Sequence, residues 1–275
     1  MLLNLEFNDD KIAIEKIKLH NAIMIIGLGG WGNAGEVSTF VVKYLVDKLE
    51  AKKFGEIPPE NFYNYLIQRP TTLIREGIIR SYVSVRNDLY YWRREKNLVL
   101  LLGYEPHLNW STYTKIILKL AEEISVERIY TIGGYLADIS HERETIISAS
   151  TNNEKLIREL QKMKVEFTDY QGPTSIYSEI LWKAKEKKID VVSVWCAVPT
   201  YVNILYPKAA YGILEKITQL MGIKLDLKDL KKRAETFKIR LEKESKYQPQ
   251  LRSFIENLGG INPERSGEKG PKYIA

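Results

Sequence analysis

The sequence predicts an α/β protein with a mostly parallel sheet that is covered by helices on both faces. Short apolar runs rich in β-branched residues recur along the chain, and each ends at a glycine, a proline or a polar turn. Amphipathic helical stretches lie between most of these runs. Continuous apolar strands that alternate with helices are typical of parallel sheets buried on both faces.

The predicted elements follow from the period of the apolar residues. The apolar runs predict strands over residues 24–28, 98–103, 128–133, 165–170 and 191–195. Helical periodicity predicts helices over residues 35–50, 110–124, 173–187 and 207–221. The segment 76–95 alternates apolar and polar residues after Gly77, which predicts an antiparallel hairpin or an extension at a sheet edge.

The chain divides into three parts by composition. Residues 1–222 form the predicted α/β domain, residues 223–246 a charged helix, and residues 247–275 a tail whose Gly, Pro and Ser content predicts mobility. The apolar positions of the charged helix repeat over two heptads, at Leu227, Leu230, Ala234, Phe237 and Leu241. This stripe either contacts a sister subunit or a partner, or it packs on its own domain.

The charge of the chain does not indicate nucleic-acid binding. The formal net charge is +6, but Lys224 to the end holds 13 Lys and Arg against 8 Asp and Glu, so the preceding part is nearly neutral. No apolar stretch approaches the roughly 18 residues of a membrane-spanning helix. The acidic N-terminus is unlike a secretory signal, and Cys196 is the only cysteine. We therefore expect a cytoplasmic protein with no nucleic-acid or membrane partner.

A glycine-rich turn, Gly27-x-Gly29-x-x-Gly32, has the spacing of a dinucleotide-binding motif. Such a site also needs a second buried strand that ends in an acidic residue for the ribose. Here the following helix runs into Pro58-Pro59 where that strand should begin, and bulky Trp31 stands where backbone must approach the pyrophosphate. We therefore predict no NAD and no other cofactor, and a turn that displays Trp31 and Asn33.

Other catalytic patterns are absent from the sequence. It contains no Walker loop and no G-x-S-x-G nucleophile turn. The histidines, His20, His107 and His141, stand in unrelated settings, so we predict no metal site. Cys196 follows an apolar strand, where a thiol is usually an inert core residue.

Polar and aromatic residues gather after the predicted strands. They are Trp31, Asn33, Glu105, Trp110, Tyr170, Thr174, Trp195 and Tyr201. In open α/β sheets ligands bind at this edge, so these residues are candidates for a ligand or partner surface. The alternative is that they are caps, turns and rim contacts. If the protein is an enzyme, Glu105, His107 and His141 are its acid–base candidates.

Seven short blocks carry a family resemblance and follow one another over about residues 20–245. They lie at residues 30–35 (GWGNAG), 62–70, 100–110, 133–141, 170–176, 195–201 and 207–209. In these blocks the chain resembles the proteasome assembly chaperone-like proteins of archaea and actinobacteria, which are related to the second subunit of the eukaryotic proteasome assembly chaperone pair.

The resemblance implies an α/β/α sandwich similar to nucleoside phosphorylases and hydrolases. It also implies a homo-oligomer, a trimer or larger, that binds proteasome subunits or related partners. The family often has Pro-His-Thr-Arg-Pro where this chain reads Ser140-His141-Glu142-Arg143-Glu144, and His where Thr200 stands. These departures weaken the case for a catalytic site.

Some archaeal relatives end in a hydrophobic-Tyr-X tripeptide that docks into pockets on the proteasome α-ring. This chain ends in Tyr273, Ile274 and Ala275, so the tyrosine stands one place early and follows a lysine. Recognition of a C-terminus needs the carboxylate at a fixed distance from its anchor. The docking pattern is therefore only partly met.

Two functions from different classes fit these observations. The favoured hypothesis is a non-enzymatic oligomeric binding protein of the assembly-chaperone type, which presents a surface and its C-terminal helix and tail to partners. The alternative is a small-molecule binder or an enzyme, similar to nucleoside phosphorylases or hydrolases, that uses the cleft at the strand ends. A deep pocket with converging Glu105, His107 or His141 would favour chemistry. A shallow, filled edge with apolar surface elsewhere would favour binding.

Overall fold

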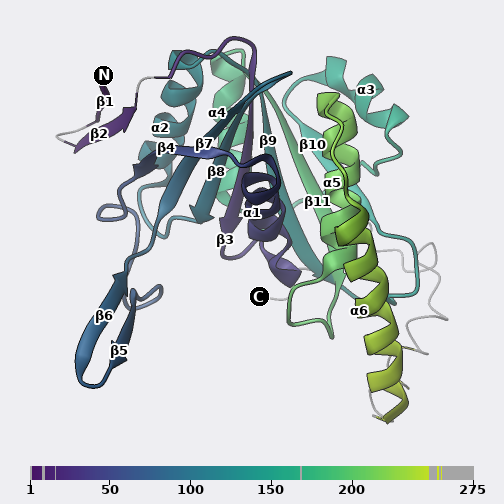
Figure 1. Ribbon diagram of the computed structural model, residues 1–275. Helices are drawn as coiled ribbons and strands as arrows, with labels where there is room; N and C mark the ends of the chain where they lie inside the picture. Colours follow the sequence, from purple (N-terminus) through teal and green to yellow (C-terminus); the bar gives the residue numbers. More distant parts are fainter. Residues whose placement is uncertain are drawn as a thin grey trace.

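A seven-stranded sheet runs through the middle of the molecule (Figure 1). The computed structural model describes residues 2–7, 10–15, 17–167, 169–247, 253 and 255. The strand order of the sheet is β10-β11-β9-β3-β8-β7-β4. Its four central strands are parallel to one another, and strands at both edges run antiparallel to their neighbours.

The parallel centre is made of the apolar runs seen in the sequence. It consists of β3 (Ala22–Gly29), β8 (Asn97–Tyr104), β9 (Val126–Ala137) and β11 (Asp190–Pro199). The antiparallel strands are β10 (Ile147–Thr151) at one edge, and β7 (Asn87–Arg93) and β4 (Lys52–Ile57) at the other. The sheet is therefore mixed, with a parallel core that holds the predicted strands.

Helices cover both faces of the sheet (Figure 1). One face carries α1 (Val37–Leu49), α3 (Ile157–Lys162) and α5 (Pro207–Met221). The other carries α2 (Trp110–Glu123) and α4 (Ile176–Glu186). Two short 3₁₀ turns, Ala34–Glu36 and Glu154–Leu156, precede α1 and α3. The predicted three-layer α/β/α sandwich is confirmed.

Successive residues of β3 enter different cores. Met24 and Ile26 pack in the core with α2 and α4, whereas Ile25 packs in the core with α1 and α5. None of the three side chains is exposed to solvent. Because both faces of β3 are covered, every position along it must be apolar, and this explains the continuous apolar run in the sequence.

Two β-hairpins lie outside the main sheet. The N-terminal one joins β1 (Leu2–Phe7) to β2 (Asp10–Glu15). Ile14 of β2 lies so close to Gly55 of β4 that a Cβ there would stand 2.1 Å from it, so the glycine makes room for the contact. The other joins β5 (Thr71–Arg75) to β6 (Ile78–Val83) and projects away from the body (Figure 1).

The segment 76–95 contains both of the features predicted for it. Glu76 and Gly77 form the turn between β5 and β6, and both have positive φ angles, of 53° and 74°. Two-residue turns with positive φ match the twist of antiparallel strands, which is why the hairpin closes at this glycine. The rest of the segment supplies β7, the antiparallel neighbour of β8.

The sequence misjudged three segments at the rims of the sheet. Residues 165–170 were predicted as a strand, but there only Glu166 pairs, in an isolated bridge to Ser148. β4 and β10 were not predicted. Edge strands have a solvated side, so they need no continuous apolar run, and the polar sequences of β4 and β10 therefore conceal their strand character.

The charged C-terminal helix, α6 (Lys228–Tyr247), packs beside α5 and extends beyond the end of the sheet (Figure 1). Leu230 is buried, and Leu227, Phe237 and Leu241 pack against the same core on the α1 and α5 side. Part of the apolar stripe is therefore covered within the subunit, and a contact of the stripe with a sister subunit or a partner stays a prediction.

Polar contacts at its N-terminal end fasten α6 to α1. Asp229 accepts a hydrogen bond of 2.8 Å from the Tyr44 hydroxyl and pairs with Lys48 at 3.1 Å. None of the helices in the described part of the chain has the length and apolarity that a membrane crossing requires. Most of the predicted tail, with Tyr273, Ile274 and Ala275, lies outside the described residues.

Replacing Leu230 with alanine is expected to lower the free energy of unfolding by about 2–4 kcal/mol, because a buried side chain is lost and a cavity remains. Urea denaturation measures the change. Ile239→Ala on the same helix is the matched control, because Ile239 is 54% exposed, and it should change the free energy by less than about 0.5 kcal/mol. Equal effects of the two substitutions would contradict the placement of α6.

Candidate functional site

The ends of the central strands surround a small cavity. Four of the residues predicted for this edge line it, Trp31, Tyr170, Thr174 and Trp195. Its volume is about 240 Å³, which is below the roughly 300–1,000 Å³ of pockets that hold a drug-sized ligand. The structure therefore brings half of the predicted surface together, around a cavity suited to a few water molecules or a small group.

The indole ring of Trp195 occupies the space between this edge and the glycines beside it. It lies across the neighbouring strand at Gly133, where a Cβ would stand 2.3 Å from its ring, and it also closes on Gly32. Its indole N–H donates a hydrogen bond of 2.8 Å to the Ser193 hydroxyl, which also accepts one from Thr131. Only glycine at positions 32 and 133 leaves the space that this ring occupies.

A buried network behind the cavity joins both helical layers to β3. The backbone N–H of Leu28 donates to the hydroxyls of Ser38 on α1 (2.9 Å) and Tyr177 on α4 (2.8 Å). The two hydroxyls lie 3.0 Å apart. Burial raises the pKa of Tyr177 far above its ordinary value, so this hydroxyl stays protonated and acts as a structural hydrogen-bonding group.

Glu105 connects two loops at the strand ends. One carboxylate oxygen accepts a hydrogen bond of 2.8 Å from the N–H of Ile176, the first residue of α4, and the other accepts one of 3.3 Å from the N–H of Trp31. Burial raises the pKa of Glu105, and these two N–H groups oppose that effect. A carboxylate at a helix N-terminus is a stabilising cap, and both oxygens of this one are engaged.

Three other predicted residues have local structural roles. Asn33 caps α1, because its side-chain oxygen accepts a hydrogen bond of 3.1 Å from the N–H of Thr39. The indole of Trp110 donates to the carbonyl of Pro106 at 2.6 Å. The Tyr201 hydroxyl contacts His141. These residues fit the alternative in which the polar residues after the strands are caps and rim contacts.

The three acid–base candidates do not converge. His107 accepts a hydrogen bond of 3.1 Å from the N–H of Asn64, and its ring packs on Tyr63. His141 lies in a separate group of contacts, in which its ring meets the Tyr201 hydroxyl and its backbone carbonyl accepts a hydrogen bond from the Lys208 ammonium group. Burial is the main cause that lowers the pKa of His141. Glu105, His107 and His141 therefore do not form with one another the acid and base pair that a hydrolase-like reaction requires.

The glycine-rich turn is used for close contacts within the protein. A Cβ at Gly27 would collide with the carbonyl of Ser38, so this glycine lets α1 approach β3. The space over Gly29 is filled by the Tyr104 ring, and that over Gly32 by Trp195. In a dinucleotide site the phosphates approach the backbone of such a turn. The filled space argues against that use here.

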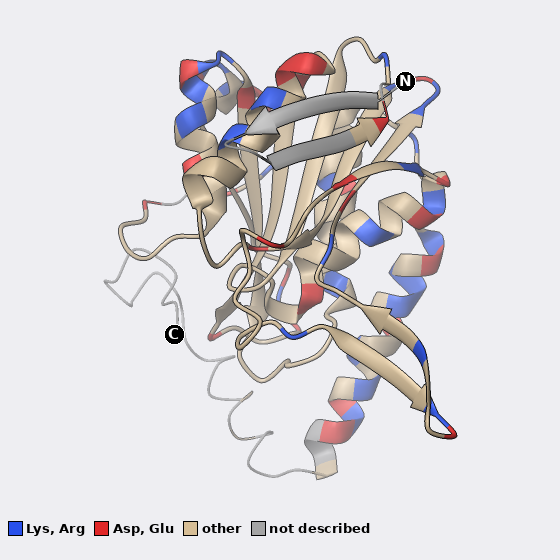
Figure 2. Cartoon of the chain, turned by 90° about the vertical axis from the view of Figure 1, so that its left-hand side faces the viewer, with Lys and Arg blue, Asp and Glu red and all other residues tan. Residues whose placement is uncertain are grey.

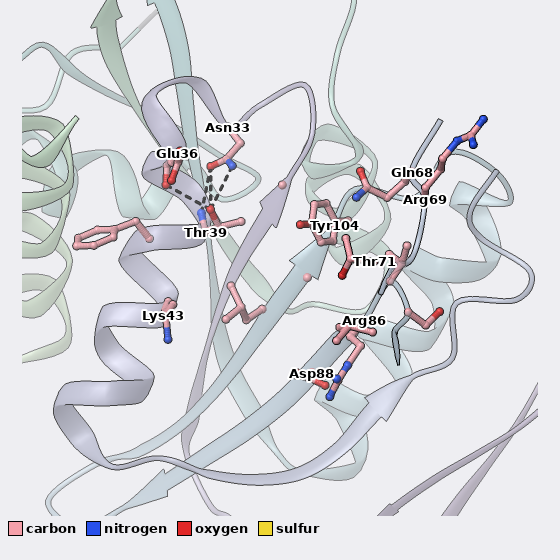
Figure 3. A pocket seen from close by; sticks show the side chains of 17 residues that line it. Asn33, Glu36, Thr39, Lys43, Gln68, Arg69, Thr71, Arg86, Asp88 and Tyr104 are labelled. Carbon is pink, nitrogen blue, oxygen red and sulfur yellow. Dashed lines mark hydrogen bonds between the residues drawn. The ribbon is translucent and has the colours of Figure 1, made fainter. Parts of the chain in front are cut away.

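A second, larger cavity lies beside α1 and was not predicted (Figure 3). Its volume is about 620 Å³, and Gly29 and residues 102–104 contribute to its lining. Figure 3 shows Thr39 and Lys43 on the α1 side and Gln68 and Thr71 on the side that leads to the β5–β6 hairpin. We call this cavity the trough.

The buried Asn87 holds the base of the hairpin next to the trough. Its side chain accepts a hydrogen bond of 2.9 Å from the N–H of Tyr104 and donates one of 2.5 Å to the Tyr63 hydroxyl. Gly103 has no side chain, and a Cβ there would overlap with Asn87. In the sequence Asn87 stands between Arg86 and Asp88, and a polar run of this kind is typical of a turn, so it gave no sign of a buried network.

The profile of the PAC2 family matches residues 27–245, from the glycine-rich turn into α6. The chain belongs to the PAC2 family. This confirms the resemblance carried by the seven sequence blocks, and all of the candidates from Trp31 to Tyr201 lie inside the matched span.

Several relatives have the same fold. A PAC2 family protein of Streptomyces avermitilis has a TM-score of 0.77 at 25% identity, over 85% of this chain and 99% of that chain. A proteasome-assembly chaperone homologue of Mycobacterium tuberculosis has a TM-score of 0.73 at 24% identity, over 87% and 97%. An archaeal proteasome activator of Pyrococcus furiosus has a TM-score of 0.67 at 23% identity, over 84% and 97%.

A similar sequence occurs in Methanocaldococcus jannaschii. That protein, which bears the name uncharacterized protein, is 26% identical over 249 residues, which are 88% of this chain and 91% of that one. Proteins similar to this chain thus come from both bacteria and archaea.

Replacing Gly133 with alanine is expected to cost about 1–3 kcal/mol of stability, because the new methyl group forces Trp195 from its place. Urea denaturation gives the free energy, and tryptophan fluorescence reports the displaced ring. Gly172→Ala is the matched control, since its methyl group would meet only the end of the partly exposed Tyr170 side chain. A Gly133→Ala protein as stable as that control would refute the constraint.

Proposed function

We propose that this PAC2 protein is a non-enzymatic, chaperone-like binding protein that forms a homo-oligomer through the β5–β6 hairpin and binds proteasome subunits. The observation that carries the proposal is the exposed apolar surface of that hairpin. The names of the relatives support it, because they include a proteasome-assembly chaperone homologue and a proteasome activator.

The hairpin exposes large apolar side chains over its whole length. Six of them are 40–62% exposed, Leu73, Ile74, Ile78, Ile79, Tyr82 and Val83. Two more, Leu66 and Ile67, lie in the segment that leads to it and are 79% and 68% exposed. Figure 2 shows the hairpin as largely uncharged, and its charged residues are Arg75, Glu76 at the turn, and Arg80. Apolar surface gathered in this way is typical of a protein contact.

The hairpin also has unpaired strand edges. Among the described strands, β5 and β6 pair only with each other. A two-stranded hairpin is marginally stable alone, and its outer edges present N–H and C=O groups that can pair with another strand. A second copy of the chain offers the same strand edges and the same apolar side chains. Contact between two copies would therefore pair the open N–H and C=O groups and bury the apolar side chains.

The strand-end edge supports binding more than chemistry. Its cavity is small, and the carboxylate of Glu105 is held by the backbone of two loops. The single thiol, Cys196, is buried, and burial raises its pKa, so it is a poor nucleophile. No described group at this edge is placed as an activated nucleophile. These features favour the non-enzymatic function over the phosphorylase-like alternative.

The experiment is light scattering on the purified protein and a hairpin variant. The chain has a mass of 31.9 kDa, and we expect a multiple of it at micromolar concentration. Ile74 and Ile79 face each other across the hairpin, so Ile74→Ser with Ile79→Ser should shift the assembly towards the monomer. The core should keep its melting temperature, because neither side chain is buried.

Trp182→Ser provides the matched control. Trp182 is a large apolar residue that is 71% exposed on α4, away from the hairpin, so its loss should leave the assembly intact. A monomeric wild-type protein, or a hairpin variant that assembles as the wild type does, would contradict the proposed contact. Biolayer interferometry against the purified proteasome of the same organism tests the partner, and an absence of binding would contradict that part of the proposal.

A further inference from the structure

His141, Glu142 and Glu242 come together where α6 passes the loop between β9 and β10. A ring nitrogen of His141 and one carboxylate oxygen from each glutamate lie within 4.8 Å of one another. Glu242 belongs to α6, far along the chain from the other two. The sequence therefore indicated no metal site, because the spacing of the histidines does not reveal that Glu242 lies beside His141.

The imidazole of His141 has one nitrogen in use and one without a partner. His141 is 2% exposed, and its Nε2 is buried with no hydrogen-bond partner in the described structure. Its Nδ1 lies 2.8 Å from the Tyr201 hydroxyl. Buried polar atoms are nearly always satisfied, so an unsatisfied nitrogen beside two carboxylates points to an additional ligand.

Tyr201 orients the imidazole for such a ligand. Its hydroxyl oxygen already accepts a hydrogen bond of 2.7 Å from the backbone N–H of His141. A hydroxyl oxygen has two lone pairs, so it can also accept a hydrogen bond from a protonated Nδ1. In that tautomer Nε2 keeps its lone pair, and the hydrogen bond at Nδ1 holds the ring as outer partners of metal-binding histidines do.

We propose that His141, Glu142 and Glu242 bind a divalent transition-metal ion such as Zn²⁺. One imidazole nitrogen and two carboxylate oxygens suit the transition metals that accept mixed nitrogen and oxygen ligands. The two carboxylates balance the charge of the ion. The site has three protein ligands, which leaves a position for water.

The geometry requires a modest closure of the cluster. With bond lengths near 2.1 Å, neighbouring ligands of a tetrahedral ion lie about 3.4 Å apart. The three atoms must therefore approach one another by up to about 1.4 Å. Neither glutamate is fully buried, so rotation of their side chains can supply this movement while His141 stays in place.

Two lysines lie near the cluster. Lys208 donates to the backbone carbonyls of His141 and Arg143, so its charge is directed at the loop. Lys238 pairs with Glu242 at 3.7 Å and is about half exposed. An ion would displace Lys238 from Glu242, and this lysine can turn into solvent at little cost.

A bound ion would link two parts of the molecule that are distant in sequence. Glu142 and His141 belong to the loop after β9, whereas Glu242 lies in the C-terminal part of α6. The ion would fasten the far end of α6 to the body, as Asp229 fastens its near end. The metal therefore sets the position of α6.

Calorimetric titration of the metal-free full chain with Zn²⁺ tests the proposal. We expect one ion per chain and a melting temperature that rises by about 5 °C at saturating Zn²⁺. Glu242→Gln and Glu142→Gln should each weaken binding by at least about tenfold. Glu235→Gln is the matched control, because Glu235 lies two turns before Glu242 on α6 and outside the cluster.

A variant that lacks the Lys238 ammonium group, which competes with the ion for Glu242, provides an independent test. Lys238→Gln should strengthen Zn²⁺ binding, because Glu242 no longer has to leave a lysine. Cobalt(II) should give visible absorption bands in the wild-type protein that are lost in Glu242→Gln. The proposal is overturned if the wild-type protein does not bind Zn²⁺, or if Glu242→Gln binds it as tightly as Glu235→Gln does.

Discussion

The close approach of Trp195 to the backbone of β9 and to the glycine-rich turn is the constraint on which the strand-end edge depends. Where other residues would place a side chain, Gly133 and Gly32 leave room for an indole ring. The ring then fills the space that a ligand would need, and its N–H is satisfied inside the sheet by Ser193. Beside Trp195, an edge that holds ligands in many α/β proteins is thereby reduced to a small cavity.

The polar groups of this edge are also held in place by contacts within the protein. Glu105 joins the start of α4 to the turn at Trp31, and the hydroxyls of Ser38 and Tyr177 share the N–H of Leu28. These groups fasten the two helical layers to β3. Chemical reactivity requires groups that are free to exchange protons, whereas these are held by several partners each. The exposed apolar surface proposed for partner binding lies elsewhere, on the β5–β6 hairpin.

Most of the fold, but little of the candidate site, could be predicted from the sequence. The central strands and four helices were predictable because a parallel sheet buried on both faces demands unbroken apolar runs, with amphipathic helices between them. β4 and β10 escaped prediction because edge strands do not have to be apolar. The segment 165–170 was wrongly predicted as a strand, because apolar residues near the rim of a sheet can be buried without pairing with a neighbouring strand. Trp31, Tyr170, Thr174 and Trp195 do line one cavity, but of the four only Trp31 follows the end of a parallel strand as predicted.

By itself, the sequence determined the α/β class, the order of the central elements and, through seven blocks of residues, the PAC2 family. Only the tertiary structure decided what the candidate residues do. It made Asn33 and Glu105 into caps, packed Leu230 of α6 into the subunit's own core, and brought Glu242 to His141. Periodicity and spacing report which face of an element is buried, but contacts between distant segments depend on how whole layers stack, and no local pattern encodes that arrangement.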